Sequence, residues 1–387
     1  MKYDFDRRID RVNSKSVKWD REVLRELYGE PDLLPLWVAD MDFRVAEPII
    51  NAMREEVSHG IFGYSKRPDS YYDAIIRWYR ERFGWAVSKD WIVYNPGVVS
   101  ALNFMLEAFC SKGDGVIIQE PVYFPFKSCI LINGLKPVVN QLIDNSGCFD
   151  MDLEDLEEKA RDPRNKALVL CSPHNPAGRV WSRQTLLKVG EICKKHDVLV
   201  FSDEVHHDLV YKKGHHCIYA SISRELEQNC IIATAPSKTF NVVGLQTSHI
   251  VIPNIEIRDA FLKSAERKHI SGQSPISMAA VEAAYAHGDQ WLSELIEYLE
   301  KNITVIDNFL YADLPLSRWK KPEATYLAWI DISAYRPDFE RIAKESGIAV
   351  INGSKFGAGG ENYIRINFAC PSQLLKEGLN RLCRIIK

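Results

Sequence analysis

Three segments decide the fold, namely KALVLCSPHNPAG (166–178), DVLVFSDEVHHD (197–208) and NCIIATAPSKTFN (229–241). Each segment begins with a nearly continuous apolar run and ends in a polar turn. Such runs are typical of strands that are buried on both faces of a parallel sheet. The runs GVIIQE (115–120) and SHIVIP (248–253) follow the same pattern. We therefore predict that all these runs are strands of one large sheet.

Longer amphipathic stretches lie between and beside the apolar runs. They predict helices at about 98–111, 183–196, 256–269 and 275–287. An alternation of strands and helices is typical of an α/β fold in which helices cover both faces of a mostly parallel sheet. We predict that this large domain spans residues 46–286.

The pattern changes after residue 286. A long helical stretch at about 289–311 comes first. Strand-like runs follow at 325–332, near 348–351 and at 362–369, and two further helices are predicted near 337–346 and at the end of the chain. This arrangement predicts a smaller α+β domain over residues 287–387. The polar first 45 residues fit neither pattern, and we predict that they form an arm that completes the small domain or packs on another subunit.

Composition excludes several classes of protein. The 387 residues include 49 Lys and Arg against 52 Asp and Glu, so the net charge of −3 offers no basic excess for a nucleic acid. The nine cysteines are an odd number without a C-x-x-C pair, which is typical of reduced thiols. No apolar run approaches the roughly 20 residues of a membrane span. We expect a cytoplasmic protein without nucleic-acid or membrane partners.

Three polar residues follow the three deciding runs, and they are Asn175, Asp203 and Lys238. Ligands of open parallel sheets bind at the carboxyl ends of the strands. An amide, a carboxylate and an amine at one rim suit an aldehyde cofactor with a pyridine ring, because the amine can form a Schiff base and the carboxylate can keep the ring nitrogen protonated. Each residue alone could be a solvated side chain or a turn cap. Their order and spacing favour the cofactor.

Two further motifs suggest where negative charges would bind. PGVVSALNFMLEAF (96–109) opens a helix with a Pro-Gly turn, so the amides of Gly97, Val98 and Val99 lie at the positive end of the helix dipole, where a phosphate is stabilised. In NYIRINFA (362–369), Arg365 interrupts an apolar strand. It is either paired within the protein or available to the carboxylate of a ligand.

At this point the chain resembles a known family. SPHNPAG (172–178), SDEVHHDL (202–209) and APSKTFN (235–241) resemble signature segments of fold-type I pyridoxal-phosphate enzymes, the class I/II aminotransferase superfamily. The segments at 35–43, 62–65, 95–103 and 120–126 resemble its MalY/PatB-type branch, the cystathionine β-lyases or carbon–sulfur lyases. The resemblance covers nearly the whole chain, and it implies the aminotransferase fold with pyridoxal 5′-phosphate (PLP) as cofactor.

The resemblance also implies a role for each catalytic residue. Lys238 would form the Schiff base with PLP and act as the catalytic base, and Asp203 would bind the pyridine nitrogen. Asn175 would contact the phenolate oxygen of the cofactor and lie beside the substrate. Tyr123 would stack on the pyridine ring. His206 stands where most aminotransferases have a tyrosine near that oxygen.

Other implied contacts hold the phosphate and the substrate. Ser237 and Tyr64 would supply hydroxyl groups to the phosphate, with Tyr64 reaching in from the neighbouring subunit of a homodimer. Gln246 falls where many relatives have a phosphate-binding arginine. Arg365 would clamp the α-carboxylate of an amino-acid substrate, and Ala39 would contribute a backbone contact.

The resemblance implies α,β-elimination from L-cystathionine or a related L-cysteine S-conjugate, giving a thiol (homocysteine for cystathionine), pyruvate and ammonia. Two alternatives stay open at this stage. The same residues would support an aminotransferase, and a regulatory role through protein contact is the second alternative.

Two other kinds of site are disfavoured. HHDLVYKKGHH (206–216) contains four histidines, but the adjacent His206 and His207 would face opposite ways and no H-E-x-x-H spacing is present, so we predict no metal site. We place His207, His215 and His216 in loops. A dinucleotide site is disfavoured because no G-x-G-x-x-G follows a first strand.

Overall fold

The computed structural model describes residues 2–212, 216–270, 272–336 and 338–386. Its largest sheet has seven strands in the order β2-β10-β9-β8-β7-β3-β4. Only β10 runs antiparallel to its neighbours, and the other pairings are parallel. The strands are β2 (Ile92–Asn95), β3 (Gly115–Ile118), β4 (Lys136–Val139), β7 (Asn165–Cys171), β8 (Leu199–Asp203), β9 (Cys230–Thr234) and β10 (Ser248–Val251). The prediction of a mostly parallel α/β sheet is confirmed, and β2 and β4 are additional strands at its two edges.

Both faces of this sheet are buried. Along β7, Leu168 and Leu170 belong to one apolar core, while Ala167 and Val169 belong to the core on the opposite face. The covering helices include those that the sequence predicts. They are α2 (Glu47–His59), α3 (Asp69–Phe83), α4 (Val98–Phe109), α5 (Pro125–Ile132), α6 (Leu153–Ala160), α7 (Arg183–Lys195), α8 (Arg224–Glu227), α10 (Ile255–Glu266) and α11 (Pro275–His287). This packing fixes the carboxyl ends of the central strands in space.

A second, four-stranded sheet is built from the last part of the chain, in the order β11-β12-β15-β14. Its strands are β11 (Arg318–Trp319), β12 (Leu327–Asp331), β14 (Ile351–Asn352) and β15 (Tyr363–Asn367), and the helices of this region are α12 (Asp289–Asp313), α13 (Phe339–Ser346) and α14 (Ser372–Ile386). A small hairpin, β5 (Ile143–Asn145) with β6 (Cys148–Asp150), was not predicted.

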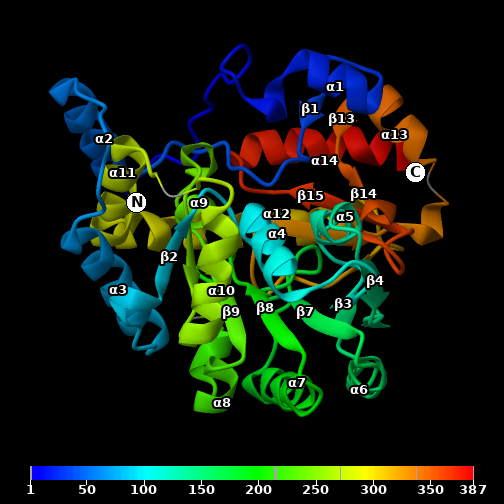
Figure 1. Cartoon of the computed structure of the whole chain (residues 1–387). Coiled ribbons are helices and arrows are strands. Elements are labelled where there is room, and N and C mark those ends of the chain that lie inside the picture. The colour runs from blue at the N-terminus through cyan, green and yellow to red at the C-terminus, as the bar shows by residue number, and fades with distance from the viewer. Residues whose placement is uncertain (1, 213–215, 271, 337, 387) are drawn as a thin grey trace.

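The N-terminal segment packs on the C-terminal elements, as Figure 1 shows where the blue chain lies beside the red. Within it, β1 (Leu34–Pro35) pairs in parallel with β13 (Ile348–Ala349), and α1 (Arg21–Tyr28) contacts α13. These contacts support our proposal that residues 1–45 and 287–387 together form the small domain and residues 46–286 the large one.

The described residues include neither a membrane-spanning helix nor a metal-binding cluster. No helix among them combines the length and the apolar character needed to cross a membrane. The same residues contain no group of three or more His, Cys, Asp or Glu side chains arranged to hold a metal ion.

Candidate active site

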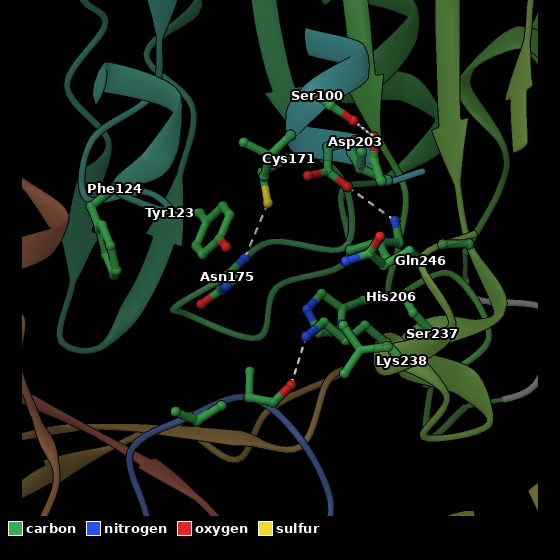
Figure 2. Close-up of a pocket in the computed structure, with 18 of the residues that line it drawn as sticks. Ser100, Tyr123, Phe124, Cys171, Asn175, Asp203, His206, Ser237, Lys238 and Gln246 are labelled. Atoms are coloured by element: carbon green, nitrogen blue, oxygen red, sulfur yellow. Dashed lines mark hydrogen bonds between the residues drawn. The ribbon is translucent and has the colours of Figure 1, made fainter. Parts of the chain in front are cut away.

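The site lies where three central strands end side by side. Cys171 at the end of β7 pairs with Asp203 at the end of β8, which in turn pairs with Ala233 of β9. The loops that leave these strands line a cavity of about 630 Å³. The predicted residues that line it are Ala39, Gly97, Val98, Val99, Tyr123, Asn175, Asp203, His206, Ser237, Lys238 and Arg365. Figure 2 shows the labelled members of this set, Tyr123, Asn175, Asp203, His206, Ser237 and Lys238, around the cavity.

Lys238 belongs to α9 (Pro236–Thr239), the short helix that follows β9. Its Nζ donates a hydrogen bond of 2.6 Å to the carbonyl oxygen of Ala39, which crosses the cavity from the N-terminal segment (Figure 2). Burial lowers the pKa of the Lys238 amine to about 8. A lowered pKa increases the neutral, nucleophilic fraction of the amine near neutral pH.

Asp203 is buried at the floor of the cavity. Its Oδ1 accepts a hydrogen bond of 3.1 Å from the backbone N–H of Val205. Burial raises the pKa of the Asp203 carboxyl to about 7, because a charge is poorly solvated there. A cationic partner inside the cavity would therefore stabilise the carboxylate.

Asn175 and Arg365, which are 190 positions apart in the sequence, are in direct contact. Arg365 Nη1 donates to Asn175 Oδ1 at 3.0 Å, and its Nη2 donates to the Trp37 carbonyl at 2.9 Å. Among the described residues, no partner accepts from the buried Arg365 Nε. Burial lowers the pKa of the Arg365 guanidinium to about 10, although it stays a cation at neutral pH. This orphaned donor suits a carboxylate ligand.

One end of the cavity is formed by the N-terminus of α4. Gly97 is the N-cap residue and contributes no side-chain cap to the helix, so the first backbone amides are left for an anion. Ser237, Gln246 and Thr247 line the same cavity. A helix N-terminus together with nearby hydroxyl groups is a suitable environment for a phosphate.

Aromatic side chains define the remaining walls. The Tyr123 ring lies 5.6 Å from the rings of both Phe124 and Phe126, measured between centroids. His206 is buried and packs edge-on against Tyr326 at 5.9 Å. Burial lowers the pKa of His206 well below its ordinary value, so the imidazole is neutral, and its Nδ1 accepts from and donates to no described residue.

Several cavity residues were not predicted from the sequence. Tyr326 donates its hydroxyl to the Ala39 carbonyl at 2.9 Å, beside Lys238. Phe124, Cys171, Thr247 and Ile351 also line the cavity. Phe124 could have been proposed from its position next to Tyr123. The other residues lie in strands or loops whose local pattern gives no signal of a ligand.

Two groups of predicted residues lie outside the cavity. Tyr64 is fully exposed in the segment between α2 and α3 and does not line the cavity of its own chain. His207 and His216 lie in loops as predicted, but they are buried, and His216 Nε2 lies 2.9 Å from Glu204 Oε2. His215 lies outside the described residues.

These features together fit a PLP-sized anionic cofactor. The cavity volume falls within the usual range of about 300–1,000 Å³ for cofactor sites. A helix N-terminus is present for a phosphate, a buried carboxyl for a pyridine nitrogen, and an amine of lowered pKa for an aldehyde. The unpartnered His206 Nδ1 and Arg365 Nε offer further polar contacts.

The fold and the cavity are those of a fold-type I PLP enzyme, whose site lies at the carboxyl ends of the strands of a mostly parallel sheet. Residues 31–382 match the family model described as aminotransferase class I and II, and the chain belongs to this family. A curated relative, cystathionine beta-lyase PatB of Bacillus subtilis (strain 168), is 43% identical over 98% of each chain.

Solved structures agree with this assignment. A PLP-bound protein of Clostridium difficile 630, named as a candidate aminotransferase, is 40% identical with a TM-score of 0.97 over 100% of each chain. The PLP-bound C–S lyase of Staphylococcus hominis is 33% identical with a TM-score of 0.93, over 99% of this chain and 98% of that one. The expected family and fold are thereby confirmed.

Proposed function

We propose that this chain is a PLP-dependent carbon–sulfur β-lyase that acts on L-cystathionine or related L-cysteine S-conjugates. The observation that carries the proposal is the 43% identity to a cystathionine β-lyase over 98% of both chains. PLP-bound structures of similar fold support the cofactor. The reaction consumes water and converts the S-conjugate into a thiol, pyruvate and ammonia.

The residues that would hold PLP are those that line the cavity. Lys238 would bond to the aldehyde carbon, Asp203 would hold a proton on the pyridine nitrogen, and Gly97–Val99 with Ser237 would bind the phosphate. Tyr123 would lie against the ring, while Asn175 and His206 would lie near the phenolate oxygen. When bound, PLP supplies an aldehyde that bonds to amines and a ring that accepts electrons from the substrate.

The chain's own groups perform the proton transfers. The Lys238 amine takes the proton from Cα of the substrate, and its lowered pKa of about 8 provides the neutral form that this step requires. Burial raises the pKa of Asp203, and with a pyridine ring bound beside it this residue, as a carboxylate, would hold a proton on the ring nitrogen. The Cβ–S bond then breaks, and its electron pair leaves with the sulfur.

Arg365 orients the substrate. Its Nη1 and Nη2 are fixed by Asn175 and by the Trp37 carbonyl, while its Nε has no described partner. A guanidinium held in this way binds a carboxylate in a defined orientation. This contact would place Cα of an α-amino acid within the cavity that Lys238 lines.

The decisive experiment is a product assay with and without an added keto acid. The purified, PLP-loaded protein should release pyruvate and a free thiol from L-cystathionine without any keto acid. If L-cystathionine is consumed only when a keto acid is supplied, and no thiol is released, the protein is a transaminase and the lyase proposal fails. A colourless protein that takes up no PLP would overturn the cofactor assignment as well.

The aminotransferase is the second candidate function, because the matching family model bears that description. The cavity residues named above serve both reactions up to removal of the Cα proton. After that step the lyase breaks the Cβ–S bond, whereas the aminotransferase returns the proton and leaves that bond intact, so the keto-acid requirement in the same assay separates them.

We also propose a cytoplasmic homodimer in which Tyr64 enters the neighbouring active site. Tyr64 is fully exposed, and the adjacent Ile61 and Phe62 are exposed apolar side chains on the same segment. Exposed apolar segments of this kind support a protein interface. All nine cysteines are free thiols, which supports a reducing compartment. Size-exclusion chromatography with light scattering tests the dimer.

A further inference from the structure

A short backbone segment, Trp37–Met41, crosses the cavity and is here named the strap. Trp37, Val38 and Ala39 line the cavity. Carbonyl oxygens of the strap accept hydrogen bonds from both cationic side chains of the site. The Ala39 oxygen accepts from Lys238, and the Trp37 oxygen accepts from Arg365. The strap therefore sets the orientation of the reactive amine and of the guanidinium together.

The neighbouring sheet of the small domain also holds the strap. Asn367 Nδ2 donates to the carbonyl oxygens of Val38 and Asp40, each at 2.6 Å. Tyr326 shares the Ala39 oxygen with Lys238. These bonds fix the backbone, but they leave the Asp40 carboxylate itself without a cation.

That cation comes from residues 11–18 at the beginning of the chain. Arg11 Nη2 lies 2.7 Å from Asp40 Oδ2, and Arg11 Nη1 lies 2.7 Å from Asp42 Oδ1. Lys18 Nζ lies 2.7 Å from Asp42 Oδ2 and donates to the Asp40 carbonyl at 3.2 Å. Trp19 Nε1 completes the contacts of Asp42 at 2.9 Å.

Two members of this cluster are buried, while Arg11 and Asp40 are 19% and 15% exposed. The Lys18 side chain is 0% exposed, and the Asp42 side chain is 4% exposed. Burying an amine is costly unless it is fully paired, so the cluster tolerates little displacement of its members. The cluster is therefore a rigid connection between the arm and the strap.

We propose that Arg11 and Lys18 are positioning residues that act through the strap: their ion pairs with Asp40 and Asp42 hold it against Lys238 and Arg365, and the Arg11–Asp40 pair sets the charge beside Lys238. They touch neither the cavity nor the reacting atoms. The inference deepens the proposed function and rests on it only in taking Lys238 as the reactive amine.

The same cluster sets the charge that Lys238 experiences. The charged and titratable groups that face Lys238 are Asp40 of the strap, Asp203 of the floor, Arg365 of the small domain, the neutral His206 and Tyr326, which shares the Ala39 oxygen. Asp40 has the strongest charge effect on the Lys238 pKa and raises it, which opposes the lowering caused by burial. Arg11 neutralises Asp40, so its loss should favour the protonated amine, whereas loss of the Asp40 charge should disfavour it.

The experiment measures the reactivity of Lys238 in the full-length chain after removal of the cofactor. Acetic anhydride is the probe, and mass spectrometry follows acetylation of Lys238 from about pH 6 to about pH 10, with the exposed Lys355 as internal reference. Arg11→Gln should slow acetylation of Lys238 about three- to tenfold near pH 7, and Asp40→Asn should accelerate it by a similar factor, because a tenfold change corresponds to one pKa unit. Neither variant should alter the rate near pH 10.

The control is Arg25→Gln, which removes an arginine from an exposed ion pair with Glu22 in the same N-terminal region. It should leave the Lys238 profile unchanged. Opposite shifts in Arg11→Gln and Asp40→Asn support the inference, because they require Arg11 to act on Lys238 through the charge of Asp40, whereas a nonspecific disturbance of the fold would move both variants in the same direction. Shifts of the same sign, or no shifts, overturn it. If Arg11→Gln does not fold, the double variant Arg11→Gln/Asp40→Asn decides, because it should show the same shift as Asp40→Asn if Arg11 acts only through Asp40, and any different shift overturns the inference.

The outcome is separable from that of the proposed function. The labelling experiment uses no substrate and no bound cofactor, so it can fail while wild-type lyase activity is present. Conversely, opposite shifts would stand even if the PLP-loaded protein released no pyruvate.

Discussion

Replacement of Arg365 by lysine tests whether the guanidinium binds the substrate carboxylate. Lysine keeps the positive charge but loses the planar fork that allows two parallel hydrogen bonds. Hydrogen bonds to charged groups contribute about 1.5–3 kcal/mol each, so losing one of two should lower kcat/KM about 10- to 150-fold. The bonds of Arg365 to Asn175 and Trp37 show that the fork is already oriented before any ligand binds.

The assay couples pyruvate release to lactate dehydrogenase and takes kcat/KM from initial rates at low L-cystathionine concentration. The visible absorbance of the bound cofactor should be retained in Arg365→Lys, because this residue is expected to contact the substrate. Arg318→Lys is the matched control, since it makes the same change at a half-exposed ion pair with Asp331 in the small sheet. This control should behave like the wild type.

A substrate analogue without the α-carboxylate sharpens the test. If Arg365 acts on the carboxylate, the decarboxylated analogue should react equally slowly with wild type and Arg365→Lys. A kcat/KM for L-cystathionine within threefold of wild type would refute the clamp. Loss of cofactor absorbance in the variant would instead assign Arg365 a structural role.

Three further predictions concern the remaining groups. Lys238→Ala should abolish pyruvate release and the visible absorbance that sodium borohydride quenches in the wild type, and retention of both would exclude Lys238 as the cofactor-bonding amine. Burial raises the pKa of Asp203 to about 7, so the folded, cofactor-free protein binds an extra proton below that pH and loses stability as the pH rises. Asp203→Asn does not lose stability in this way. Its free energy of unfolding in urea, relative to that of the wild type, should therefore increase by about 2–3 kcal/mol between about pH 5 and about pH 7.5. A difference that does not change with pH would contradict the burial argument. Finally, mixing inactive Tyr64→Ala with inactive Lys238→Ala should restore up to about a quarter of wild-type activity through hybrid dimers, whereas no recovery after confirmed subunit exchange would exclude a shared site.

The central sheet was predictable because its strands carry a strong signal. The runs that became β3, β7, β8, β9 and β10 are apolar on both faces, since each strand contacts a core on either side. β2 and β4 escaped prediction for the converse reason, because they form the two edges and are only partly buried. β4 even contains Pro137, which is tolerated at an edge but weakens a strand pattern.

The candidate site was predictable only where side-chain type and spacing carry the information. Asn175, Asp203 and Lys238 each follow a recognisable strand, so topology alone brings them to one rim. Lys238 donates to the backbone carbonyl of Ala39, and because every residue has a backbone carbonyl, the residue type does not indicate this contact. The burial of Lys18 could not be predicted either, because its segment is polar in sequence and its partners, Asp40 and Asp42, lie 22 and 24 positions away.

The three ionisable groups of the cavity share one physical property, which links the stability of the protein to its ligands. Burial raises the pKa of Asp203 and lowers the pKa values of Lys238 and Arg365, so the surrounding protein disfavours the charged form of each group. A pyridinium beside Asp203 and a carboxylate on Arg365 would supply the missing counter-charges. Binding would then stabilise the protein most at these groups, because the ligand charges offset the free-energy cost of burying them. On this reasoning cofactor and substrate should each raise the unfolding temperature, with the cofactor effect reduced in Asp203→Asn and the substrate effect reduced in Arg365→Lys.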